Sequence, residues 1–121
     1  MFKEKLENII ERTEGAVAAL IMGADGIEVE KVLRAEGREA NLDVVAAEFA
    51  SLVRSVQRTG GDIGLGSLRE LNVVFDGATF VIRLFNRDYF VVLALEPEGN
   101  FGRGRFELRK TELELSREFA L

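Results

Sequence analysis

The chain contains no cysteine, no histidine and no tryptophan, and it has one tyrosine and one proline among its 121 residues. Without cysteine there is neither a disulfide framework nor a thiolate zinc site, which fits a reducing compartment. Without histidine or cysteine, the usual general bases, activated nucleophiles and transition-metal ligands are missing, and a hydrolase triad cannot be assembled. We therefore expect no catalytic residues, no metal site and no cofactor.

Long hydrophobic runs are also missing. The longest, Ala16–Met22 and Tyr89–Leu95, have seven residues each, whereas a membrane helix needs roughly 20. The first residues lead directly into an amphipathic helical pattern, without the features of a signal peptide. With 47% hydrophobic and 31% charged residues, the composition is that of an ordinary globular chain. We expect a single domain over residues 1–121, located in the cytoplasm and without a membrane segment.

Positive charge is in the minority, since the net charge is −5. Binding to nucleic acid favours a basic face, so this balance argues against a nucleic-acid partner. Arginine is more frequent than lysine among the positively charged residues, with twelve arginines and four lysines. Arginine bridges carboxylates and stacks on other groups better than lysine does, which favours protein contacts. GC-rich coding bias or a warm habitat also explains an excess of arginine, and we give this explanation the larger weight.

The hydrophobic pattern predicts a helix, a hairpin, a long helix, a three-strand meander and a last helix. Asp76-Gly77 separates the first two strands of the meander and is a strong hairpin signal, because these residues tolerate positive φ. Asn41 or Asp43 is the predicted N-cap of the long helix, and Gly60-Gly61 is its predicted end. The elements are expected over residues 2–13, 16–22, 27–33, 44–59, 71–75, 79–85 and 89–95 and from the cap Asn100 onward.

The long helix has two distinct faces. One is an apolar stripe, and the face beside it consists of small residues interrupted by arginine. Arg54 and Arg58 are one helical turn apart, so they project from the same side and are able to meet carboxylates on a partner. The alternative is that the small residues serve a contact between paired helices of a dimer. The stripe consists of Val45, Phe49, Leu52, Val53 and Val56, and the predicted partner face consists of Ala47, Ala50, Ser51, Arg54 and Arg58.

The first strand of the meander is a predicted dimer interface. Leu71, Val73 and Phe75 alternate on one face, and Asn72 is the one polar residue between Leu71 and Phe75. If this strand lies at the sheet edge, it has few polar residues that would prevent pairing with another strand. Such an edge in a soluble protein usually has a partner. We therefore expect a homodimer.

Two segments resemble functional motifs but lack the structural context that those motifs require. The glycine-rich segment from Gly60 to Gly66 follows a helix and precedes a strand, whereas a phosphate-binding loop follows a strand and opens a helix. Arg87 stands at a hairpin tip, and we interpret it as a solvated turn residue rather than as an arginine finger.

Taken in order, these segments resemble the Roadblock family, named for a dynein light chain, over nearly the whole chain. The hairpin glycines and the Gly-x-Leu-x-x-Leu segment that leads into the third strand are the strongest support for this resemblance. The matching segments are Glu14–Met22, Asp25–Val29, Leu42–Thr59, Gly66–Leu71, Thr79–Phe85, Tyr89–Leu95 with Pro97, and Asn100–Arg109.

The resemblance implies an α+β fold with a single five-stranded antiparallel sheet in the order 2-1-5-4-3. The implied topology is α-β-β-α-β-β-β-α, with the long helix on one face and the terminal helices on the other. Family members typically dimerise through the third strand and second helix, which creates a two-helix platform for small Ras-like GTPases. Bacterial relatives of this size act as GTPase-activating proteins by remodelling the GTPase. The resemblance thus implies a non-catalytic GTPase regulator or scaffold.

Three roles stay open at this point: GTPase activation, passive scaffolding and a structural subunit. A profilin-like sensor of small ligands is the alternative from another class, because a related topology serves that purpose. A sensor needs an enclosed pocket with convergent polar groups between sheet and helix. The inward positions Phe80, Ile82, Leu84, Val91 and Leu93 instead predict a filled core.

Overall fold

The computed structural model describes residues 2–34 and 39–119 and shows three helices and five strands. Their order is the predicted one. None of the helices in this described part has the length and apolar content that a bilayer crossing requires. The elements are α1 (Phe2–Arg12), β1 (Ala16–Gly23), β2 (Glu28–Leu33), α2 (Glu39–Asp62), β3 (Glu70–Val74), β4 (Thr79–Leu84), β5 (Tyr89–Leu95) and α3 (Phe101–Phe119).

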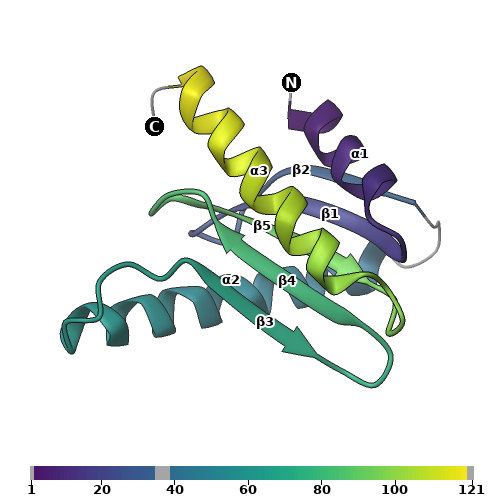
Figure 1. Cartoon of the computed structure of the whole chain (residues 1–121). Coiled ribbons are helices and arrows are strands. Elements are labelled where there is room, and N and C mark those ends of the chain that lie inside the picture. The colour runs from purple at the N-terminus through teal and green to yellow at the C-terminus, as the bar shows by residue number, and fades with distance from the viewer. Residues whose placement is uncertain (1, 35–38, 120–121) are drawn as a thin grey trace.

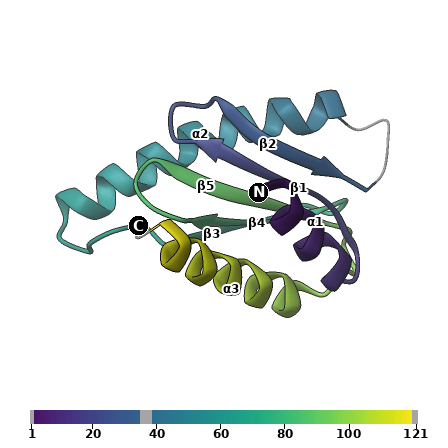
Figure 2. The same cartoon turned by 90° about the horizontal axis from the view of Figure 1, so that it is seen from above.

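The strands form one sheet in the order β2-β1-β5-β4-β3, and every neighbouring pair is antiparallel. Figures 1 and 2 show α2 on one face of the sheet and α1 with α3 on the other. The predicted fold class and strand order are therefore confirmed. β2 lies at one edge and β3 at the other, as the implied order requires.

Alternation along the central strands produces two cores. In β1, Leu20 and Met22 face α2, whereas Ala19 and Ile21 face the terminal helices. A strand buried on both faces reads as a continuous apolar run, which is what Ala16–Met22 is. The sheet therefore supports two helical layers.

A close approach of two loops fixes where the sheet meets the terminal helices. Gly15 has φ +83°, and a Cβ placed on it would lie 2.4 Å from the Cα of Gly99. Glycine is required there because any side chain would collide with main-chain atoms. Asn100 caps α3, since its Oδ1 accepts a hydrogen bond of 3.0 Å from the N–H of Arg103. That predicted cap is confirmed.

The predicted bounds of α2 are wrong at both ends. The helix is already formed at Glu39, ahead of both predicted caps, and it continues through Gly60 and Gly61. Its end is a Schellman motif at Gly64, which has φ +78°. In this motif the N–H of Leu65 bonds the carbonyl of Gly60 at 2.8 Å, and the N–H of Gly64 bonds that of Gly61 at 3.2 Å. The glycine with positive φ ends the helix, whereas the two before it are tolerated as helical residues.

Candidate partner-binding and dimer surfaces

The edge strand β3 presents backbone groups that no described strand pairs. Phe75 donates its N–H to Ala78 at 2.8 Å, and the carbonyl of Arg69 accepts from Leu84 at 3.0 Å. Odd-numbered residues of this strand therefore direct their backbone groups toward β4, because these groups alternate in direction along a strand. The backbone groups of Asn72 and Val74 consequently point out of the sheet.

Apolar side chains accompany this open edge. Leu71 and Val73 are half-buried and pack against the core beneath α2. Phe75 is 54% exposed, and its ring meets that of Phe80 edge-on at 6.0 Å. The three predicted dimer residues thus share one face of an edge strand, and each keeps part of its surface in solvent. What this surface binds stays a prediction.

One flank of α2 continues the apolar surface. Val56 lines a hollow with Leu65 and Leu68, next to the start of β3. Leu52 lies one helical turn before Val56 and is 41% exposed, unlike Phe49 and Val53 of the same apolar stripe, which are buried. We name Leu52, Val56, Leu65, Val74 and Phe75, together with the backbone of β3, the apolar edge.

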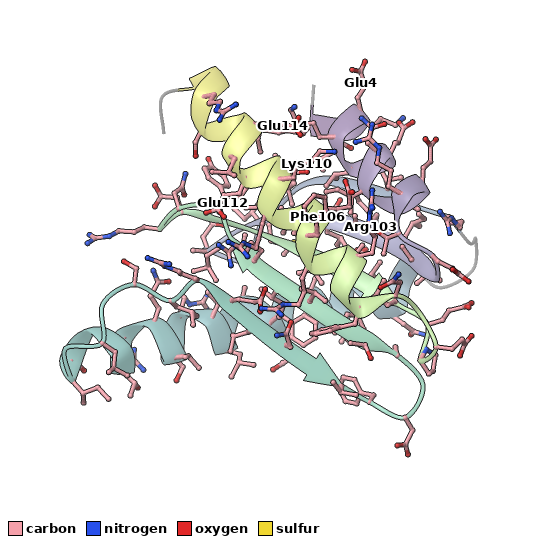
Figure 3. All side chains as sticks on the ribbon, viewed as in Figure 1. Glu4, Arg103, Phe106, Lys110, Glu112 and Glu114 are labelled. Carbon is pink, nitrogen blue, oxygen red and sulfur yellow. The ribbon has the colours of Figure 1, made fainter. Side chains whose placement is uncertain are left out.

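Salt bridges join β3 and β4 to α3. Glu70 accepts from Arg105 at 2.8 and 2.9 Å, and Arg83 bonds Glu112, which is labelled in Figure 3, at 3.0 Å. Burial raises the pKa of Glu70, but the hydrogen bonds from Arg105 and Asn72 outweigh burial and hold it below its ordinary value. The hydrogen bond to Glu70 raises the pKa of Arg105 in turn. These pairs fix the start of the edge strand to α3.

The opposite flank of α2 carries the predicted partner face. Ala47, Ser51, Arg54 and Arg58 are exposed there. This flank lies toward β2, because Lys31 of β2 bonds Asp43 of α2 at 3.0 Å. The partner face and the apolar edge therefore occupy different sides of the helix.

The prediction that Ala50 belongs to the partner face is wrong. It is 0% exposed and belongs to the core beneath α2. A Cβ placed on Gly26 would lie 3.9 Å from that of Ala50, so the β1–β2 turn passes directly over this position. Ala50 is small because the helix packs closely on that turn, and its side chain is not available to a partner.

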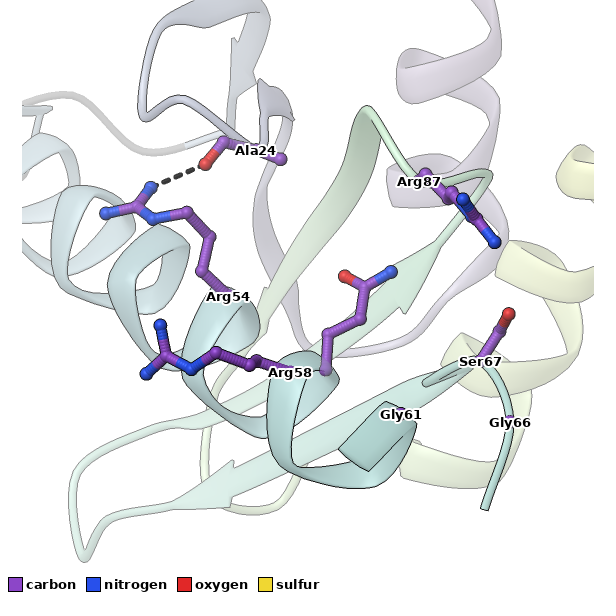
Figure 4. Close-up of a pocket in the computed structure, with 8 residues that line it drawn as sticks. Ala24, Arg54, Arg58, Gly61, Gly66, Ser67 and Arg87 are labelled. Carbon is purple, nitrogen blue, oxygen red and sulfur yellow. Dashed lines mark hydrogen bonds between the residues drawn. The ribbon is translucent and has the colours of Figure 1, made fainter. Parts of the chain in front are cut away.

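The backbone of Ala24 connects three elements beside this flank. Its N–H donates to the carbonyl of Asp88 in the β4–β5 turn at 2.7 Å. Its carbonyl accepts a hydrogen bond from the guanidinium of Arg54 in α2, drawn as a dashed line in Figure 4. We name this arrangement the Ala24 junction.

An open groove of about 470 Å³ lies beside the junction. Arg54, Arg58 and Arg87 all line it, and no carboxylate is among its lining residues (Figure 4). The remaining lining residues are Ala24, Gln57, Gly61, Gly66 and Ser67. We name this the arginine groove. A guanidinium group binds a carboxylate through paired hydrogen bonds.

Arg87 is the groove residue that the sequence reading missed. Its own segment is an ordinary hairpin tip, but the order 2-1-5-4-3 places β1 beside β5. The β1–β2 and β4–β5 turns therefore meet at the same end of the sheet, next to α2. The strand order implied by the resemblance was the one signal that could have brought Arg87 to this site.

No family model and no curated protein matches the chain. The crystal structure of MglC from Myxococcus xanthus has 36% sequence identity, with 98% of both chains covered and a TM-score of 0.67. The chain belongs to the Roadblock/LC7 family.

Two less similar structures share the fold. The gliding protein MglB of Thermus thermophilus has a TM-score of 0.82 at 18% identity, with 95% of this chain and 85% of that chain covered. A Roadblock/LC7 domain of Streptomyces avermitilis has a TM-score of 0.79 at 14% identity, with 97% and 95% covered. This Roadblock protein therefore keeps the family architecture over nearly its full length.

Proposed function

We propose that this Roadblock protein is a non-catalytic regulator or scaffold of a small Ras-like GTPase and acts as a homodimer. Family membership supports the regulatory role, and so does the similarity to MglC and to the gliding protein MglB. The single observation that carries the dimer is the apolar edge, where the outer side of β3 is paired by no described strand and Val74 and Phe75 are exposed. Exposed apolar edges of this kind pair with a second strand.

The same geometry supports different tasks for the two flanks of α2. Pairing two β3 strands brings together the flanks of α2 that carry Leu52 and Val56. Ala47, Ser51, Arg54 and Arg58 lie on the other flank and stay exposed in such a dimer. We therefore assign the GTPase to this second flank, and we favour the partner over the dimer as the role of its small residues.

The finer role is to activate GTP hydrolysis. The resemblance to bacterial Roadblock relatives of this size implies that activation would proceed by remodelling the GTPase rather than by inserting an arginine. A profilin-like sensor is disfavoured, since Phe49, Val53, Phe80 and Ile82 fill the space between the sheet and α2.

The test uses the Ras-like GTPase encoded in the same genome, loaded with GTP. We expect binding in titration calorimetry and no nucleotide hydrolysis by the Roadblock protein alone. Faster single-turnover hydrolysis in the mixture identifies an activator, whereas binding at an unchanged rate identifies a scaffold. Absence of binding to both the GTP-loaded and the GDP-loaded forms contradicts the proposal.

A further inference from the structure

The arginine groove has a charge opposite to that of the chain that contains it. The net charge is −5, yet three arginines and no carboxylate line this groove. A concave surface with one sign of charge concentrates ligands of the opposite sign. Such a concentration of positive charge in an acidic protein is a feature that the fold itself does not require.

These arginines differ from the paired arginines of the structure. Arg83, Arg103 and Arg105 each pair with a glutamate, at 3.0, 2.7 and 2.8 Å. In the described part of the chain, Arg54, Arg58 and Arg87 have no carboxylate within salt-bridge distance. The hydrogen bond from Arg54 to Ala24 uses one donor and leaves the charge uncompensated.

Two parts of the groove are held in place before a ligand binds. The Ala24 junction holds the guanidinium of Arg54 and, through Asp88, the turn that carries Arg87. That turn is further fixed because Oδ1 of Asn86 accepts from the N–H of Asp88 at 2.7 Å and of Tyr89 at 3.1 Å. A site whose groups are held before binding loses less conformational entropy when a ligand arrives.

We propose that the arginine groove receives the carboxylates of an acidic segment of a partner protein. The inference deepens the proposed function, and it rests on that function for the identity of the partner, the GTPase. Arg87 then becomes part of the partner surface together with Arg54 and Arg58. The three guanidinium groups, carried by α2 and the β4–β5 turn, donate hydrogen bonds to carboxylates spaced along a peptide rather than to one compact ion.

The surroundings favour a short acidic segment over a polyanion. Asp25 and Asp88 line the neighbouring hollow on the far side of the Ala24 junction. A nucleic acid or an anionic membrane extends beyond the groove and meets these carboxylates and the negative surface of the chain. A segment confined to the groove avoids this repulsion.

The test is fluorescence anisotropy with a fluorescein-labelled hexaglutamate peptide at low ionic strength. We expect saturable binding to the wild-type protein that weakens about tenfold or more in the double variant Arg58→Glu/Arg87→Glu. The charge-matched control is Arg109→Glu/Arg117→Glu, at two exposed arginines of α3 without a described carboxylate partner, which should bind as the wild type does. Circular dichroism establishes that all variants are folded.

Three results of the peptide assay would overturn the inference. They are no saturable binding by the wild type, an equal loss in Arg109→Glu/Arg117→Glu, and competition by inorganic pyrophosphate stronger than that by unlabelled hexaglutamate. Binding of the GTPase distinguishes a failure of this inference from a failure of the proposed function. If the GTPase binds the double variant as tightly as the wild type, the groove assignment fails alone. If the wild type binds the peptide through the groove but no GTPase, the proposed function fails alone.

Discussion

Arg54 of α2 donates a hydrogen bond to the main-chain carbonyl of Ala24, 30 positions earlier in the sequence. This contact connects the helix that carries the partner face to the turn between β1 and β2. The N–H of the same Ala24 donates to Asp88, so a single residue joins α2 to two hairpin tips. The geometry of the arginine groove depends on this junction.

Arg54→Ala should therefore cost stability even though Arg54 is exposed. A hydrogen bond of this kind contributes about 0.5–1.5 kcal/mol, and we expect a loss of that size in the free energy of unfolding. Urea denaturation measures it. Arg58→Ala is the matched control, because Arg58 has no described hydrogen bond and should change stability by less than about 0.5 kcal/mol. Equal effects of the two substitutions would show that the Ala24 contact is not stabilising.

Substitution by arginine should affect stability differently at Ala50 and at Ala47. Ala50→Arg places a charge at a position that is 0% exposed, and we expect destabilisation by more than about 3 kcal/mol. Ala47→Arg adds the same side chain on the exposed flank and should leave the thermal midpoint nearly unchanged, while it weakens GTPase binding. Thermal unfolding and calorimetry measure the two effects, and a stable Ala50→Arg protein would contradict the burial of this position.

The element order could be predicted because its signals are local. Asp76-Gly77 marks a hairpin, Gly15 ends the first helix, and alternating apolar residues mark the strands. It was harder to predict which face of α2 is buried, because small and apolar residues occur around most of its circumference. Ala50 and Leu52 are about 200° apart on a helical wheel, and periodicity alone assigned Ala50 outward and Leu52 inward.

The actual orientation of α2 is set by contacts distant in sequence. The β1–β2 turn covers Ala50, and β3, the last strand on its side of the sheet, leaves Leu52 exposed. The arginine groove likewise needs two hairpin tips and a helix to meet, which no local pattern encodes. Arg87 was therefore read as a solvated turn residue.

Glu70→Gln should remove a pH-dependent part of the stability. The pKa of Glu70 is lowered in the folded protein, so its contribution is present above the unfolded-state pKa and is lost as the pH falls through the folded-state value. We expect the variant to be about 1 kcal/mol less stable at neutral pH. The difference from the wild type should vanish in acid.

Urea denaturation as a function of pH checks this prediction. Glu98→Gln is the control, since Glu98 is exposed and has no described charged partner. A difference between wild type and Glu70→Gln that stays constant from neutral to acidic pH would refute the role of the Arg105 pair.

The direction of the backbone groups in β3 permits a selective test of the dimer. Asn72→Pro removes an outward N–H without affecting the bonds to β4, and proline is tolerated at a sheet edge in that orientation. We expect a folded monomer. Asn72→Ala keeps the N–H and should remain a dimer by analytical ultracentrifugation. A dimeric Asn72→Pro protein would place the dimer contact elsewhere.

The central claim is that the apolar edge joins two copies while the opposite flank of α2 binds a GTPase. The most direct measurement is the mass by light scattering of the protein mixed with the Ras-like GTPase from the same genome, held in its GTP-bound form. For the wild type we expect a complex with two copies of this 13.4 kDa chain and bound GTPase. Arg58→Glu should give the dimer and free GTPase as separate species. A wild type that elutes as a monomer, or an Arg58→Glu dimer that still carries GTPase, would contradict the account.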